Sequence, residues 1–168
     1  MNLEKPTPKN FSTIETKPNI TIRSATPSDL PFIQGLLPSY AEFGLPPWRD
    51  ADVMVKTDSE VFVTALQNGA TIFIAEDQSQ TPLGFVHLHP GSDHYFKGKQ
   101  CHISDLIVAP PGRGQGVGKV LMAKAEAWAE SEGYERLTLN VFAGNERARK
   151  LYEELGFGAD VVKYVKEI

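Results

Sequence analysis

The chain has 168 residues, of which 41% are hydrophobic, and this size and apolar fraction predict one compact globular domain. Its 17 Lys and Arg against 21 Asp and Glu give a formal net charge of −4, which argues against a nucleic-acid binder. A single cysteine, Cys101, excludes an internal disulfide framework and a multi-cysteine metal site. No apolar run could cross a bilayer and the N-terminus lacks a signal-peptide core, so we expect a cytoplasmic protein with no membrane partner.

The N-terminal half predicts a tail, one short strand and two helical stretches. Residues 1–19 contain three prolines and no apolar periodicity, so we expect a flexible tail before a single domain over 20–168. A strand is predicted at 20–23. Thr26 should cap a helix with Pro27 in its first turn, and apolar spacing extends that helix to about Phe43 although Pro38 threatens a kink. Residues 50–68 predict a second helix.

The C-terminal half alternates strands and helices. Residues 71–76 and 83–89 predict an antiparallel hairpin, and 100–108 predict another strand. A glycine-dense stretch at 110–118 leads into a helix at 116–132, followed by a strand at 136–142. Asn145 should cap a further helix that ends at Gly156, and 158–166 predict a final strand.

The glycine-dense stretch predicts an anion site. A strand that runs into glycines and then a helix presents unpaired backbone N–H groups and the positive end of the helix dipole, which suit a phosphate. The side chains of Arg113 and Lys119 could add charged donors. The P-loop and G-x-G-x-x-G patterns both fail here, so nucleotide-binding modules of those classes are disfavoured.

Two motifs resemble those of the GNAT N-acetyltransferase superfamily. The first is R-x-x-G-x-G at residues 113–118, and the second is N-x-x-A-x-x-L-Y-x-x-L-G-F at 145–157. The resemblance covers roughly 21–168. It implies an α/β fold with a mixed, mostly antiparallel, twisted sheet of six to seven strands and helices on both faces. Strands 100–108 and 136–142 would form a central, splayed parallel pair.

The resemblance also implies acetyl-CoA as cosubstrate, with no metal. The pantetheine arm would lie along the backbone of Leu106, Ile107 and Val108. The pyrophosphate would sit on the N–H groups of Gly114, Gln115, Gly116, Val117 and Gly118, near Arg113 and Lys119. Further contacts would come from Asn145, Ala148 and Tyr152, with Asn140 as another candidate. A plain N-cap role for Asn145 and an ordinary strand position for Asn140 stay open.

Acetylation of an amine by a thioester needs a neutral amine and a proton for the departing thiolate. Tyr152 is the candidate acid, because a phenol keeps its proton at neutral pH, although it could also be a core aromatic. The candidate bases are Asp105, His102 and Ser104; relatives often carry a carboxylate at the position of Ser104. Strand alternation places His102, Ser104 and Leu106 on one side, and Ile103, Asp105 and Ile107 on the other. His87 and His89 could assist as base or water holder, or form a two-histidine metal pair.

These motifs predict an enzyme that transfers acetyl from acetyl-CoA directly to a primary amine of a small molecule or peptide. Trp48 and an acidic group favour a cationic amine, although a solvated surface explains the same charges: Glu42, Asp50, Asp52, Asp58 and Glu60. An acyl-CoA-binding regulatory module without turnover and an acyltransferase for longer acyl-CoA are the alternatives. The expected partners are acetyl-CoA and the amine, with monomer and homodimer both open.

Overall fold

A computed structural model describes residues 20–168, so the predicted tail at 1–19 lies outside the described part of the chain. Its centre is one sheet of five strands whose spatial order follows the chain order. The strands are β1 (Thr21–Ser24), β2 (Thr71–Glu76), β3 (Pro82–Gly91), β4 (Gln100–Val108) and β5 (Arg136–Leu139). Successive pairs from β1 to β4 are antiparallel, and β4 pairs with β5 in parallel, as predicted.

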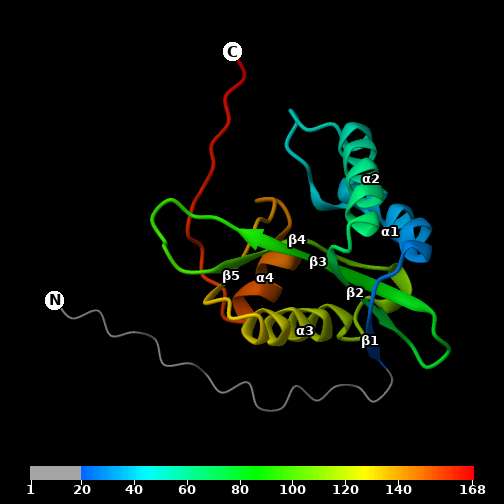
Figure 1. Ribbon diagram of the computed structural model, residues 1–168. Helices are drawn as coiled ribbons and strands as arrows, with labels where there is room; N and C mark the ends of the chain where they lie inside the picture. The colour runs from blue at the N-terminus through cyan, green and yellow to red at the C-terminus, as the bar shows by residue number, and fades with distance from the viewer. Residues whose placement is uncertain (1–19) are drawn as a thin grey trace.

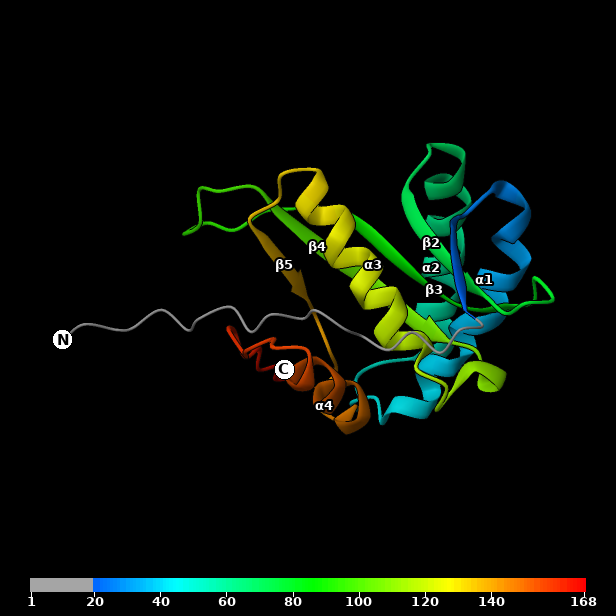
Figure 2. The ribbon, with the colours of Figure 1, turned by 90° about the horizontal axis from the view of Figure 1, so that it is seen from below.

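Helices lie on both faces of the sheet, which confirms the prediction (Figures 1 and 2). One face carries η1 (Pro27–Asp29), α1 (Leu30–Leu36), η2 (Leu37–Phe43) and α2 (Ala51–Gln67), where η marks a 3-10 helix. The other face carries α3 (Val117–Ser131), which follows the short η3 (Pro110–Gly112), and α4 (Glu146–Glu154), which packs against the same core as α3.

Local capping explains where the helices begin. Thr26 caps η1 in a capping box with Asp29, and Asp50 Oδ1 accepts hydrogen bonds from the N–H groups of Asp52 and Val53 at the start of α2. The predicted helix at 26–43 is not continuous, because α1 ends at Leu36 and η2 follows with Pro38 in its first turn. Proline lacks the N–H that an uninterrupted α-helix would need there.

The sheet separates two apolar clusters. Leu88, Cys101 and Ile103 pack on the α3 face, whereas Phe85 and Ile107 pack on the face covered by α1 and α2. We call these the α3 face and the α2 face. Strands β3 and β4 are therefore buried on both sides, which holds them rigidly where the functional side chains emerge.

Two boundary predictions at the C-terminal end are wrong. Strand β5 stops at Leu139 rather than residue 142, and residues 158–166 form no strand. The sheet in the described residues has five strands rather than six or seven. The side chains of Val161, Val162 and Tyr164 are 84%, 70% and 91% exposed, and the segment runs away from the sheet (Figure 1). Their β propensity predicted a strand. A strand also needs a neighbouring strand to hydrogen-bond with, and propensity does not supply one.

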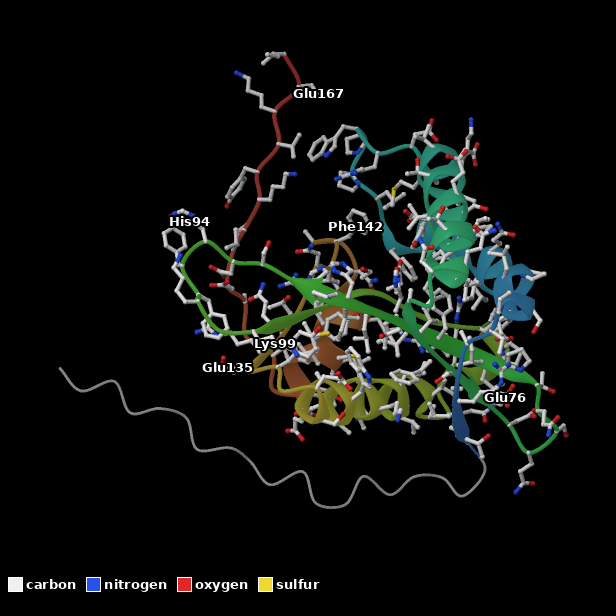
Figure 3. The ribbon with its side chains drawn as sticks, in the orientation of Figure 1. Glu76, His94, Lys99, Glu135, Phe142 and Glu167 are labelled. Carbon is white, nitrogen blue, oxygen red and sulfur yellow. The ribbon has the colours of Figure 1, made fainter. Side chains whose placement is uncertain are left out.

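An ion-pair cluster ties β1 to the rest of the domain. Arg23 contacts Asp29 at 2.7 Å and Glu76 at 2.6 Å, and Figure 3 shows Glu76 at the end of β2 beside β1. The guanidinium of Arg23 holds the pKa of the Asp29 carboxyl below its usual range. Both carboxylates are buried, so their charges depend on this partner.

Arg23→Ala is expected to lower the free energy of unfolding by about 3 kcal/mol, because it leaves two buried carboxylates without their cation. Urea unfolding at neutral pH measures the effect. Arg147→Ala, on the exposed surface of α4, is the control and should change stability by less than about 0.5 kcal/mol. Equal stabilities for the two variants would contradict the role given to Arg23.

Candidate active site

A β-bulge in β4 decides which side chains share a face. His87 lies opposite Asp105 and Leu88 lies opposite Ile103, so Ser104 has no partner on β3. The extra residue shifts the alternation by one position. His102 and Asp105 are three residues apart, yet both lie on the α2 face, where His102 contacts His89 with 5.3 Å between ring centroids.

The predicted grouping of β4 side chains is therefore wrong. It placed Leu106 with His102, and Ile103 with Asp105 and Ile107, from uninterrupted alternation. In the structure Ile103 and Leu106 pack in the α3-face cluster, while Ile107 packs in the α2-face cluster. Alternation holds only within a regular ladder, and a bulge resets it. Asp105 and His102 consequently belong to one site instead of opposite faces.

Asp105 is held by side chains from two other elements. The Tyr40 hydroxyl, from η2, donates to Asp105 Oδ1 at 3.0 Å. His87 Nδ1, from β3, lies 3.3 Å from Asp105 Oδ2, and because a carboxylate only accepts, that nitrogen carries the hydrogen. The His87 ring also packs against Phe62 of α2, 5.3 Å between centroids. The carboxylate is thus fixed at both oxygens.

Burial changes the proton affinities around Asp105. It raises the pKa of the Tyr40 hydroxyl, and the charges of Asp105 and Asp58 act in the same direction. It also raises the pKa of Asp58, although hydrogen bonding to Tyr40 opposes that rise. Tyr40 therefore stays a protonated donor between two acidic groups. The sequence interpretation missed Tyr40, since it read that position as part of an apolar helix face; the available signal was a hydroxyl on a buried stripe, which needs a partner.

His102 has both ring nitrogens engaged. Its Nδ1 lies 2.9 Å from Thr138 Oγ1, and the Thr138 hydroxyl in turn donates to the Cys101 carbonyl. The amide of Asn140 lies 3.4 Å from His102 Nε2. Burial lowers the pKa of His102, with His89 acting in the same direction. The ring is therefore held neutral between β4 and β5, while Ser104, at the bulge, is exposed.

Strands β4 and β5 part beyond the bulge. Their pairing runs from Gln100 opposite Arg136 to Ile103 opposite Leu139, and β4 then continues to Val108 with no partner on β5. We call the region beyond this last pair the strand gap. Figure 2 shows β5 leading away from β4 toward α4. Leu106, Ile107 and Val108 lie in the part of β4 that pairs with β3 but not with β5.

Tyr152 lies on α4 at the same gap. Its half-buried ring packs with the α3-face cluster and contacts Phe157, 5.9 Å between centroids. Burial raises the pKa of Tyr152 to about 12, and the negative charge of Asp105 adds to the rise. The phenol therefore keeps its proton at neutral pH.

The glycine loop before α3 has the donors expected of an anion site. Gly114 and Gly116 have φ of +75° and +85°, which side chains rarely adopt. Within residues 20–168, no protein acceptor is hydrogen-bonded to the backbone N–H groups of Gly114, Gly116, Val117 or Gly118. The N–H of Gln115 differs, because it donates to the Gly112 carbonyl at 3.3 Å. Four of the five predicted donors are free.

The polar side chains of the loop are bound to other protein groups. Arg113 pairs with Glu42 of η2 at 2.8 Å, and its Nε donates to the Val108 carbonyl. Lys119 pairs with Glu154 of α4 at 3.0 Å. These two side chains are therefore already paired, whereas the four backbone N–H groups are free.

Asn145 has the helix-capping role that the sequence left open. Its side chain accepts from the N–H of Ala148 at 3.1 Å, at the start of α4. The preceding turn packs closely on the end of η2, since a Cβ added at Gly144 would lie 2.7 Å from the Gly44 carbonyl. Figure 3 shows Phe142 in this turn, and Arg49 lies over its ring at 6.0 Å. These contacts join the N-terminal helices to the gap.

The acidic residues grouped in the sequence have different surroundings in the structure, although Asp50 and Asp52 line one pocket together with Trp48. Glu42 pairs with Arg113, Asp50 caps α2, and Asp58 lies beside Tyr40. An open pocket of about 540 Å³ is lined by residues 47–52 and by Glu167 of the terminal segment, labelled in Figure 3. Among the described residues of this acidic group, Asp58 is the one that interacts with Tyr40 and Asp105.

Comparison with known proteins identifies the family. The sequence model of the acetyltransferase (GNAT) family matches residues 33–157, and the chain belongs to this family. An uncharacterized N-acetyltransferase of Bacillus subtilis (strain 168), YhfO, is 30% identical over 142 residues, which cover 84% of this chain and 91% of that protein.

Two further relatives agree with this family. The aminoglycoside N(6')-acetyltransferase type 1 of Stenotrophomonas maltophilia is 27% identical, covering 82% of this chain and 85% of that protein. A crystal structure of a ribosomal-protein-alanine N-acetyltransferase from Brucella melitensis biovar Abortus 2308 matches with a TM-score of 0.65 and 25% identity, covering 89% and 99% of the two chains. In residues 20–168, no helix is long and apolar enough to span a bilayer, and no group of three His, Cys, Asp or Glu side chains is placed to hold a metal.

Tyr152→Phe is expected to reduce the loss of folding stability at high pH. Below about pH 10, an ordinary phenol keeps its proton in the folded and unfolded states alike, so the full stability is present. As pH rises toward the folded-state pKa of about 12, the unfolded chain loses this proton first, and stability falls. The loss reaches roughly 2–3 kcal/mol. Urea unfolding at about pH 9 and about pH 11 should show a smaller decline for Tyr152→Phe than for the wild type; Tyr164→Phe, at an exposed tyrosine, should decline like the wild type.

Proposed function

We propose that the protein transfers the acetyl group of acetyl-CoA directly to a primary amine of a small molecule or peptide. One observation carries this proposal: four free backbone N–H groups stand at the start of α3, after the stretch of β4 that has no β5 partner. The family and the relatives named above, all N-acetyltransferases, support the same reaction class.

The loop and gap suit acetyl-CoA. Free N–H groups at the start of α3 and the positive end of its dipole match a pyrophosphate, and positive φ at Gly114 and Gly116 brings the backbone close to it. The edge of β4 at residues 106–108 has no partner on β5, so an extended arm could lie along it as a further strand would. Five further residues would lie beside the cofactor without offering it a free side-chain donor. They are Arg113, Gln115, Lys119, Asn145 and Ala148. Acetyl-CoA supplies the activated acetyl group as a thioester.

Tyr152 would give its proton to the departing sulfur. Its raised pKa keeps it protonated at neutral pH. It follows Leu151 of α4, and the side chains of Leu151 and Val108 both lie beside Gly118. Of the candidate bases, Asp105 is the one that belongs to a hydrogen-bonded group, with Tyr40 and His87. Both His102 nitrogens are engaged, and a Ser104 hydroxyl is a weak base. The amine would lose its proton toward this group and then attack as the neutral nucleophile.

The test is thiol release from acetyl-CoA with a panel of primary amines, including diamines, aminoglycosides and peptides with free lysine or N-terminal amines. We expect amine-dependent release and a rise in melting temperature with acetyl-CoA but not with ATP or NAD. Binding without release across the panel would favour the regulatory module, and faster release from longer acyl-CoA would favour the other alternative. Absence of both binding and release would overturn the proposal.

A further inference from the structure

Tyr40, His87 and Asp105 form a polar cluster inside an apolar layer. They come from η2, β3 and β4, and their surroundings on the α2 face include Phe62, Phe85 and Ile107. Tyr40 and His87 are only 9% and 7% exposed. Burying three polar side chains costs free energy even when they are hydrogen-bonded, and apolar residues would fill the same space more favourably. The cluster therefore has a use beyond packing.

The hydrogen bonds of the cluster fix where its protons are. Tyr40 donates to one oxygen of Asp105, and His87 Nδ1 donates to the other. In a neutral imidazole with its hydrogen on Nδ1, the lone pair is on Nε2. Asp105 accepts from both neighbours, and His87 Nε2 has no hydrogen-bond partner among the described residues, so Nε2 is a basic atom that the cluster leaves available.

This inference rests on the proposed acetyl transfer and concerns its base. We propose that His87 is the proton acceptor of the reaction, and that Asp105 and Tyr40 are positioning residues that act through it. One N–H bond of the substrate ammonium breaks, its electron pair stays on nitrogen as the nucleophile, and the proton passes to His87 Nε2. Because His87 is buried, the proton passes through one hydrogen-bonded water. The Asp105 carboxylate stabilises the resulting imidazolium.

His89 can pass the proton from His87 to solvent. It is two residues along β3, its ring centroid lies 6.2 Å from that of His87, and its side chain is exposed. Its Nδ1 lies 2.8 Å from the Pro90 carbonyl and must donate to it, so its Nε2 can accept. Solvent then takes the proton from His89, which returns the pair to its starting state.

Other titratable groups surround the pair, so the test must report on His87 itself. They are Tyr40, Asp58, His89, His102 and Tyr152. With an amine that the wild type acetylates, His87→Ala should lower kcat by about 10²-fold or more and leave the KM for acetyl-CoA unchanged. Added imidazole should restore turnover as its concentration rises, because it can enter the space left by the ring.

The matched control is His94→Ala. His94 lies in the exposed loop between β3 and β4 (Figure 3). Its variant should have wild-type turnover with no response to imidazole. Loss of activity in His87→Ala without imidazole rescue, in a variant whose thermal melt is intact, would overturn the proposal. His87→Gln, which keeps a polar side chain, replaces the alanine variant if that one does not fold.

Nitrogen NMR of ¹⁵N-histidine-labelled wild-type protein provides a readout that does not need turnover. The signals missing from His87→Gln identify His87, and we expect its hydrogen on Nδ1. Asp105→Asn should shift that tautomer toward Nε2, since an amide can donate to Nδ1 where a carboxylate cannot. A wild-type His87 with its hydrogen on Nε2 would overturn the proposal. Absence of thiol release from the wild type, with the expected tautomer present, would instead count against the proposed function alone.

Discussion

Tyr152→Phe is expected to reduce turnover by about 10² to 10⁴, the usual contribution of a positioned proton donor. The change removes only the hydroxyl and keeps the ring that packs against Phe157 and the α3-face cluster. Acetyl-CoA affinity and the melting temperature at neutral pH should therefore change little. Steady-state kinetics, isothermal titration and thermal melts on one preparation measure the three quantities.

Tyr134→Phe is the matched control for this substitution. Tyr134 is also a partly buried tyrosine of the α3-face cluster, but it packs with Trp128 and Lys99 at the other end of α3. It should keep wild-type turnover. Wild-type turnover in Tyr152→Phe would show that the phenol only packs, and a parallel loss of stability would identify a core role instead.

Gly116→Asp is expected to weaken acetyl-CoA binding by roughly 10²-fold or more, because a carboxylate would stand among the N–H groups meant for a phosphate. The fold should survive. Aspartate tolerates a positive φ better than most residues, and no atom lies within 4 Å of a Cβ added at Gly116. Isothermal titration with acetyl-CoA measures the loss.

Gly133→Asp is the control for backbone strain and charge. Gly133 has a similar φ of +73° and equally open surroundings, but it follows the opposite end of α3. Its variant should bind acetyl-CoA normally. Arg113→Ala should weaken binding less than Gly116→Asp, since backbone donors remain and the guanidinium is already paired with Glu42. Unchanged affinity in Gly116→Asp would mean that the loop is only a turn.

The features predictable from the sequence were local ones. The caps at Thr26 and Asn145 and the glycine loop before α3 depend on residues a few positions apart, so a linear pattern contains the whole interaction. The parallel pairing of β4 with β5 followed from the helix between them and from the family resemblance.

The features that the sequence could not predict depend on distant or absent neighbours. Tyr40 and Asp105 are 65 positions apart, and Arg113 finds Glu42 on a different helix, so no local pattern contains either pair. The bulge at Ser104 arises from how β4 fits β3, and alternation alone assumes that no bulge is present. Residues 158–166 have strand propensity, but a strand also needs a partner, which propensity does not provide.

The bulge makes Ser104 an extra residue of β4 that stands outside the ladder. Leu88 and His87 are consecutive on β3 and lie opposite Ile103 and Asp105, so removal of Ser104 would make Ile103 and Asp105 consecutive as well. Asp105 would keep its place on the α2 face, and Ile107 and Val108 would keep their clusters. A relative that lacks one residue at this point can therefore carry the same site, with its carboxylate directly after the residue that corresponds to Ile103.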